Sequence, residues 1–283
     1  MVYNTLISAT ALSSHLDNPA WVVLDCRFRL NDPQAGRSMY HEAHIPGALY
    51  ADLDRDLSRA PATPDEGRHP LPDLKVFKAK LGNWGINNGV QVVCYDDFGG
   101  MLAARLWWML RYLGHEAVAV LDGGWPSWLA HKFPTSNQHE SSWPTTFEGN
   151  PRPKMLASFE DVAQLSAQGD GWRLVDARDA ARYRGEKEPI DAKAGHIPGA
   201  RNRPYAENLT PIGTMQNADQ LQQSWQALLG DESPSNLIMY CGSGVSACHN
   251  LLAMEHVGLG GARLFIPSWS GWSADPARPI ETG

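Results

Sequence analysis

The reactive side chains of this sequence gather around one cysteine. Cys241 follows an apolar run over residues 236–240 and is followed by Gly-Ser-Gly-Val-Ser-Ala, after which a segment of helical period begins. This order predicts a strand, a glycine-bearing loop and a helix, with the thiol at the helix N-terminus. Backbone N–H groups and the helix dipole stabilise an anion there, and a cysteine so placed reacts as a thiolate. We therefore expect Cys241 to be a nucleophile that can carry a persulfide.

The rest of the loop is expected to bind the sulfur and the substrate. Its glycines let several N–H groups point at one spot, and its hydroxyls can donate hydrogen bonds. These binding residues are Gly242, Gly244, Val245, Ser246 and Ala247. A buried, inert Cys241 is the alternative, but the loop composition argues against it. Cys248 is expected in the core, since it shares an apolar helix face with Val245, Leu251 and Leu252.

An internal repeat organises the chain. His44-Ile45-Pro46-Gly47-Ala48 returns as the pentapeptide beginning at His196, and the apolar-Asp-x-Arg block of residues 23–27 returns at residues 174–178. Both matches have an offset of about 150 residues, which indicates a duplicated domain. We expect an N-terminal domain over residues 1–134, a polar linker over residues 135–152 and a C-terminal domain over residues 153–283.

Each copy alternates short apolar runs with segments of helical period. The expected strands are residues 21–25, 91–95 and 117–121 in the first copy, and 172–176, 236–240 and 262–265 in the second. The expected helices, residues 102–113 and 245–257, end at Gly114 and Gly258, where a left-handed cap is favoured. This pattern predicts an α/β fold: two domains, each a mostly parallel sheet with helices on both faces. Ligands then bind beyond the carboxyl ends of the strands.

The two copies differ at the reactive loop. Asp96 stands in the first copy where Cys241 stands in the second. We expect an acidic side chain to be unfavourable at a loop that binds anions. The first domain is therefore predicted to be non-catalytic.

Composition narrows the class of protein. The formal net charge is −7 with 19% charged and 43% hydrophobic residues, and there is no long apolar segment. Neither nucleic acid nor a membrane is an expected partner, and a cytoplasmic location is expected. The four cysteines are too few and scattered for a disulfide framework, and no metal-ligand spacing occurs. We expect neither a metal nor a cofactor.

Taken together, the paired HIPGA and Asp-x-Arg blocks and the Cys-Gly-Ser-Gly-Val loop resemble the rhodanese (sulfurtransferase) family over nearly the whole chain. The loop is similar to that of 3-mercaptopyruvate sulfurtransferases. Thiosulfate-preferring members carry Arg and Lys after the cysteine, and this loop has neither. The resemblance implies rhodanese-like domains and a Cys241 persulfide, formed from 3-mercaptopyruvate and passed to cyanide, a small thiol or thioredoxin.

The resemblance also implies roles for other residues. Arg182 matches the arginine that binds the substrate carboxylate, but the second substrate arginine expected shortly after it is missing from residues 186–191. Ser243 and His44 match two members of a proton relay, with Asp32 as a candidate for the acid. A turn-forming role remains open for His44, because His196 repeats it where no second active cysteine needs it. A structural ion pair is favoured for Arg178.

Several alternatives follow from the same residues. A thiosulfate:cyanide sulfurtransferase is one, and a persulfide carrier that docks on a partner without enzymatic turnover is another. A cysteine-based phosphatase needs an arginine where Ala247 stands. A papain-like protease needs histidine and asparagine far downstream of the cysteine, and too little chain follows Cys241.

Overall fold

The computed structural model describes residues 2–283, which form two compact units. The N-terminal unit comprises Met1–Arg59, Leu71–Arg152 and Pro211–Met215. The C-terminal unit comprises Ala60–Pro70, Pro153–Thr210 and Gln216–Gly283. No helix within residues 2–283 has the length and apolar character needed to cross a bilayer.

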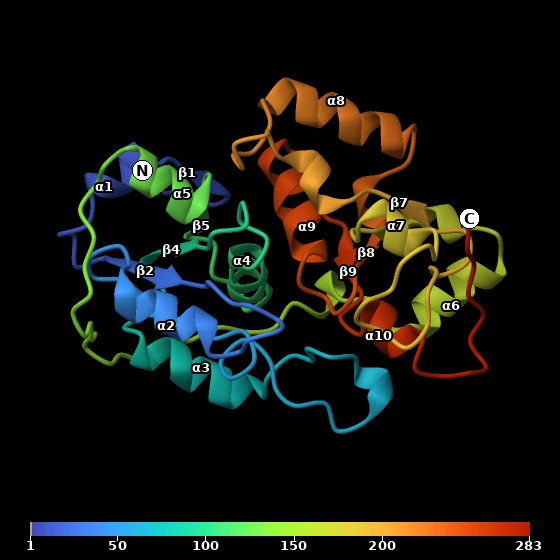
Figure 1. Cartoon of the computed structure of the whole chain (residues 1–283), viewed down its shortest axis with the longest axis horizontal. Coiled ribbons are helices and arrows are strands. Elements are labelled where there is room, and N and C mark those ends of the chain that lie inside the picture. The colour runs from blue at the N-terminus through green and yellow to red at the C-terminus, as the bar shows by residue number, and fades with distance from the viewer. Residues whose placement is uncertain (1) are drawn as a thin grey trace. The chain divides into compact units, whose positions relative to one another are not determined.

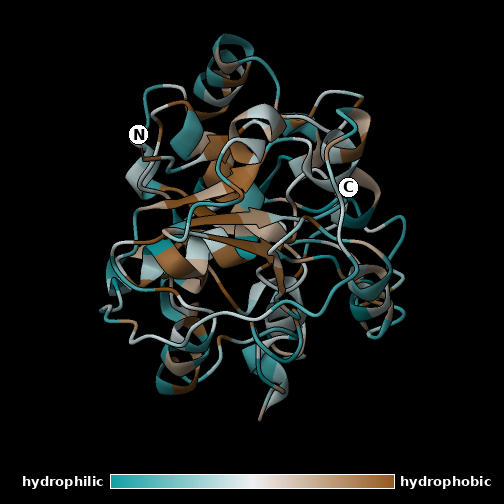
Figure 2. Ribbon diagram, turned by 90° about the vertical axis from the view of Figure 1, so that its left-hand side faces the viewer, coloured by the Kyte–Doolittle hydropathy of each residue, from teal (hydrophilic) through white to brown (hydrophobic). Residues whose placement is uncertain are grey.

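The N-terminal unit is built on a parallel five-stranded sheet in the order β1-β5-β4-β2-β3 (Figure 1). Its strands are β1 (Leu6–Ile7), β2 (Trp21–Asp25), β3 (Leu49–Tyr50), β4 (Gln91–Tyr95) and β5 (Val118–Leu121). Its helices are α1 (Ala9–Ser13), α2 (Ala35–Glu42), α3 (Leu74–Asn83), α4 (Ala103–Tyr112) and α5 (Gly124–Ala130). Strands β4 and β5 are buried along their whole length, as continuous apolar strands of a covered parallel sheet must be. Figure 2 shows mostly hydrophobic colouring on the strands at the centre of its view.

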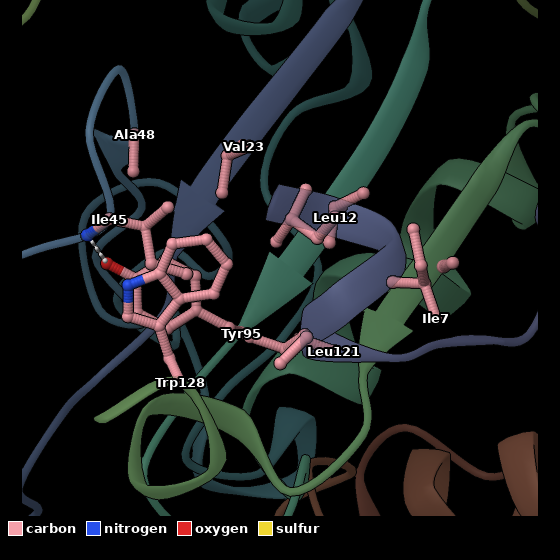
Figure 3. Close-up of a cluster of buried hydrophobic side chains, with 11 residues drawn as sticks. Ile7, Leu12, Val23, Ile45, Ala48, Tyr95, Leu121 and Trp128 are labelled. Carbon is pink, nitrogen blue, oxygen red and sulfur yellow. Dashed lines mark hydrogen bonds between the residues drawn. The ribbon is translucent and has the colours of Figure 1, made fainter. Parts of the chain in front are cut away.

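One face of this sheet carries the core shown in Figure 3. Leu12 of α1 and Trp128 of α5 pack there on strand residues such as Val23 and Tyr95. The Tyr95 hydroxyl accepts a hydrogen bond of 3.2 Å from the amide of Ile45, which ties the HIPGA turn to the sheet. The repeated pentapeptide is therefore a structural element of the domain.

The C-terminal unit repeats this plan with a parallel four-stranded sheet in the order β7-β6-β8-β9. Its strands are β6 (Leu174–Asp176), β7 (Arg201–Asn202), β8 (Ile238–Tyr240) and β9 (Arg263–Leu264). Its α-helices are α6 (Phe159–Ala167), α7 (Ala180–Tyr183), α8 (Ala218–Leu229), α9 (Ala247–His256) and α10 (Ser268–Trp272). Short 3-10 turns occupy Pro64–Glu66, Pro153–Met155, Gly171–Arg173, Tyr205–Asn208 and Pro234–Asn236. Side chains of α6 and α10 form one core with β6 and β8.

The observed elements confirm the predicted α/β class and most of the predicted segments. Strands β2 and β4 have the expected bounds, whereas β6 and β8 start later because 3-10 turns take their first residues. Gly114 and Gly258 have φ of 89° and 76°, so both predicted left-handed helix ends are present.

The units differ in detail from the expected domain boundaries. Residues 135–152, expected to be a linker, bond within the N-terminal unit: Ser136 pairs with His44, and the Thr145 amide donates to Gly82. Residues 60–70 belong to the C-terminal unit instead, although they lie within the first repeat of the sequence. Residues 60–70 therefore add side chains to the unit that contains Cys241.

Candidate active site

The reactive loop of the C-terminal unit has the predicted geometry. Cys241 directly follows β8, and only 2% of the residue is exposed. Helix α9 begins after the loop, and its N-cap, Ser246, makes no side-chain capping bond. Within residues 2–283, the amides of Val245, Ser246 and Ala247 have no protein acceptor. The loop and the first turn of α9 therefore keep N–H donors for an anion, as expected for a thiolate or persulfide site.

Helix α10 fixes the backbone of the cysteine. The amide of Cys241 donates to Ser268 Oγ over 3.2 Å, and the Cys241 carbonyl accepts from the Trp269 amide over 2.9 Å. Ser268 is fully buried and has a φ of 52°, a conformation uncommon for residues other than glycine. Its hydroxyl also donates to the Phe265 carbonyl over 2.9 Å. The strained Ser268 thus holds the start of the loop in place.

The N-terminal loop shows what such a cradle binds. The Asp96 carboxylate is fully buried and accepts hydrogen bonds of 2.7–2.8 Å from the amides of Phe98, Gly100, Leu102 and Ala103. Burial raises the pKa of Asp96, and these four donors oppose that effect. The expectation that an acid would be unfavourable here is wrong, because the carboxylate is itself the bound anion. A side chain fills this cradle. The non-catalytic role of the first domain stays a prediction.

The Ser243 hydroxyl has a partner that the sequence analysis missed. His69 Nδ1 lies 2.7 Å from Ser243 Oγ, and both residues are buried. His69 comes from the Ala60–Pro70 segment, which belongs to the C-terminal unit. No periodicity or metal-like spacing marks this proline-rich stretch, so its only sequence signal was an isolated Arg-His pair.

Two arginines lie against the loop. A Cβ atom built on Gly242 would lie 3.6 Å from Arg182 Nη1 and 2.8 Å from Arg68 Nη2. An alanine at position 242 would therefore displace the end of the Arg68 side chain. Arg182, at α7, was predicted for this place, whereas Arg68 was not. Both guanidinium groups bind the same carboxylate, Asp191, with Arg182 Nη2 at 3.0 Å from its Oδ2.

Glu188 completes this cluster. It accepts from Arg182 Nη2 over 2.7 Å and from Arg178 Nη1 over 3.2 Å. Burial raises the pKa of Glu188, but hydrogen bonds from Arg182 and from backbone amides outweigh burial and leave it below its usual value. Arg178 is itself held by Asp176 over 2.7 Å, and both are buried. This contact supports the structural role expected for Arg178.

Three other residues named in the sequence analysis have structural contacts. Gly244 has a φ of 73°, which only glycine adopts readily, so it supplies the bend of the loop. Cys248 is fully buried, and its Sγ lies 3.4 Å from the Gly244 carbonyl, as expected of a core residue. The candidate acid Asp32 caps the turn into α2, where its Oδ1 accepts from the amide of Gln34 over 3.1 Å.

His44 is held inside the N-terminal unit. Its Nδ1 lies 2.7 Å from the Tyr40 carbonyl, and its ring stacks on Tyr40 with centroids 4.1 Å apart. His196 repeats both contacts in the C-terminal unit, with the Tyr183 carbonyl at 2.8 Å and the Tyr183 ring at 3.7 Å. Because the same arrangement occurs in both copies, these contacts favour the turn-forming role for both histidines.

Comparison with known proteins identifies the family. The sequence profile of the rhodanese-like domain matches residues 8–131 and again residues 158–275. The chain belongs to the rhodanese family. It is 46% identical over 98% of its length to a probable 3-mercaptopyruvate sulfurtransferase of Pseudomonas aeruginosa, and the match covers 98% of that protein. It is 37% identical over 92% of its length to a putative thiosulfate sulfurtransferase of Mycobacterium tuberculosis, covering 90% of it.

Solved structures agree with this assignment. The 3-mercaptopyruvate sulfurtransferase from Leishmania major superposes with a TM-score of 0.84 at 29% identity, covering 95% of this chain and 74% of that one. The predicted family, the tandem rhodanese fold and the enzyme class, a sulfurtransferase, are thus confirmed.

Proposed function

We propose that this rhodanese-family protein takes a sulfur atom from 3-mercaptopyruvate and passes it, through a persulfide on Cys241, to a thiophilic acceptor. The observation that carries the choice of donor is the 2.7 Å contact between Ser243 and His69. This contact supports a role for Ser243, two residues after the cysteine, because a histidine at this distance can exchange a proton with its hydroxyl. The donor 3-mercaptopyruvate needs such a group, because its departing fragment is an enolate.

In the first half-reaction the Cys241 thiolate attacks the sulfur of 3-mercaptopyruvate. A sulfur–sulfur bond forms and the carbon–sulfur bond breaks, with its electron pair leaving on the pyruvate enolate. Ser243 donates a proton to this enolate and is reprotonated by His69, whose role is exerted through the serine. Pyruvate leaves, and the persulfide stays on Cys241.

The N–H groups at the end of the loop suit this intermediate. Among the residues that the structure describes, no protein acceptor lies on the amides of Val245, Ser246 and Ala247. These amides occupy the part of the cradle in which Asp96 is bound in the other domain. Charged acceptors strengthen such hydrogen bonds, so a persulfide anion is favoured in the site. The Arg182 guanidinium, close to Gly242, is proposed to bind the donor's carboxylate.

In the second half-reaction a soft nucleophile attacks the outer sulfur and restores the Cys241 thiolate. Cyanide would leave as thiocyanate, and a small thiol or reduced thioredoxin would leave as a persulfide. We propose that the first domain is non-catalytic, because Asp96 occupies its cradle, and that the protein acts in the cytoplasm.

Thiosulfate is the second candidate donor, because the Arg68 and Arg182 guanidinium groups beside the loop offer hydrogen-bond donors for its sulfonate end. Steady-state kcat/KM values for both donors, with cyanide as acceptor, decide between them. We expect a preference for 3-mercaptopyruvate of at least about 10-fold. Cys241→Ser should abolish both activities, and Cys248→Ser is its matched control. A preference for thiosulfate would overturn the proposed donor, and turnover by Cys241→Ser would overturn the mechanism.

A further inference from the structure

Counting partners in residues 2–283 only, the guanidinium groups of Arg68 and Arg182 each leave donors unused on the side that faces Gly242. Arg182 spends Nε and Nη2 on Glu188 and Asp191, which leaves Nη1 near Gly242. Arg68 spends Nη1 on Asp191, which leaves Nη2 near the same Gly242. The buried Arg68 Nε also has no partner within residues 2–283. Two cationic amino groups thus converge on one side of the reactive loop.

We propose that Arg68 is the second cation that binds the carboxylate of the sulfur donor, together with Arg182. The inference rests on the proposed function for the identity of the donor, whereas the anion site itself depends only on the convergence of the two guanidinium groups. Two planar guanidinium groups on one carboxylate fix its direction as well as its position.

The cluster explains how Arg68 takes this place. Where the resemblance implies a second arginine, after Arg182, the chain has Glu188 and Asp191. The side chain of Asp191 is only 6% exposed, and it binds Arg68 with one oxygen and Arg182 with the other. The Asp191 carboxylate, in the region where a second arginine is expected, therefore binds an arginine from a distant segment.

Backbone contacts seat Arg68 firmly in the C-terminal unit. Its amide donates to Ser270 Oγ over 3.1 Å. The preceding Gly67 has a φ of 75°, and a Cβ built there would lie 2.4 Å from the Pro267 carbonyl oxygen. Pro267 and Ser270 flank or belong to α10, the helix that also holds Cys241. The cation and the nucleophile are thus positioned by the same helix.

The charges around the site suit a donor with one negative charge. Arg68, Arg178 and Arg182 alternate with three carboxylates, from Asp176, Glu188 and Asp191. The cluster is neutral as a whole, so its donors are directional without a large positive potential. Such a site favours a monocarboxylate such as 3-mercaptopyruvate over the dianion thiosulfate.

The test compares two thiol reagents that differ only at the anionic end. 3-Bromopyruvate carries a carboxylate where bromoacetone carries a methyl group, and both alkylate a thiolate with loss of bromide. Rates of alkylation at Cys241 are measured for the wild type, Arg68→Ala and Arg68→Lys. Arg184→Ala is the control, because it removes an exposed arginine that is paired with Glu186 in the same unit.

We expect Arg68→Ala to slow 3-bromopyruvate about 10- to 100-fold relative to bromoacetone, the effect of losing a charged hydrogen bond. Arg184→Ala should leave the ratio unchanged, and Arg68→Lys should recover part of it. An unchanged ratio in Arg68→Ala overturns the proposal. Equal slowing of both reagents is one form of this result, and it would mean that Arg68 only supports the loop. Alkylation needs no sulfur transfer, so failure of the proposed donor would appear separately, in turnover.

Discussion

The contact between Ser243 and His69 makes the sharpest prediction about the reaction. Ser243→Ala removes the hydroxyl without adding bulk, and Cys241 and its loop backbone are left in place. The fragment that leaves 3-mercaptopyruvate is the pyruvate enolate, which must be protonated. Turnover with this donor should therefore fall. The fragment that leaves thiosulfate is sulfite, which departs without a proton. Turnover with thiosulfate should therefore be retained.

The magnitude follows from the role. Positioned proton donors contribute about 10²- to 10⁴-fold, and here the donor serine is buried with its partner at 2.7 Å. We expect kcat/KM for 3-mercaptopyruvate to fall about 10²- to 10³-fold, which is about 3–4 kcal/mol of transition-state stabilisation. The value for thiosulfate should stay within about threefold.

A double-mutant cycle tests whether His69 acts through the serine. His69→Asn should lower kcat/KM for 3-mercaptopyruvate, and the double variant should be no worse than Ser243→Ala alone. Pyruvate release and thiocyanate formation are assayed in parallel, with thermal unfolding as the control for folding. Additive losses, or an equal loss with thiosulfate, would refute the relay.

Three further predictions concern other parts of the molecule. Asp96→Ala should lower the free energy of unfolding in urea by about 2–4 kcal/mol, because buried amides lose their acceptor. The variant should leave kcat/KM unchanged. Asp97→Ala, which removes a partly exposed ion pair, is the control. His44→Gln should cost about 1–2 kcal/mol of stability in the same assay and leave kcat/KM within about threefold, and a loss of kcat alone would restore the relay role that the family resemblance implies. Gly242→Ala should raise KM for 3-mercaptopyruvate about 10-fold with kcat retained, because the alanine methyl group meets Arg68 Nη2. Steady-state kinetics measure both constants, and a fall in kcat would contradict the prediction.

Much of the fold and the nucleophile could be predicted because local sequence determines them. The apolar run ending at Tyr240, the glycine-bearing loop and the helix that ends before Gly258 each follow from neighbouring residues. The repeat placed Asp96 opposite Cys241. Its chemical meaning was misjudged, because the backbone donors that surround the carboxylate are not visible in a sequence.

The partners of the loop could not be predicted, since they depend on contacts between distant segments. Arg68 and His69 lie in a stretch without periodicity, and that stretch leaves the first repeat to join the C-terminal unit. The first HIPGA histidine, His44, was the candidate with a visible pattern. Its repetition as His196 was the clue that the pattern records structure.

The central claim is that Cys241 carries the transferred sulfur. Reduced protein is mixed with one equivalent of 3-mercaptopyruvate without an acceptor, and the intact mass, the peptide masses and the released pyruvate are measured. We expect one added sulfur atom on the Cys241 peptide and one pyruvate per chain, in the wild type and in Cys248→Ser alike. Pyruvate release without sulfur on Cys241, or sulfur found on Cys248, would contradict the mechanism.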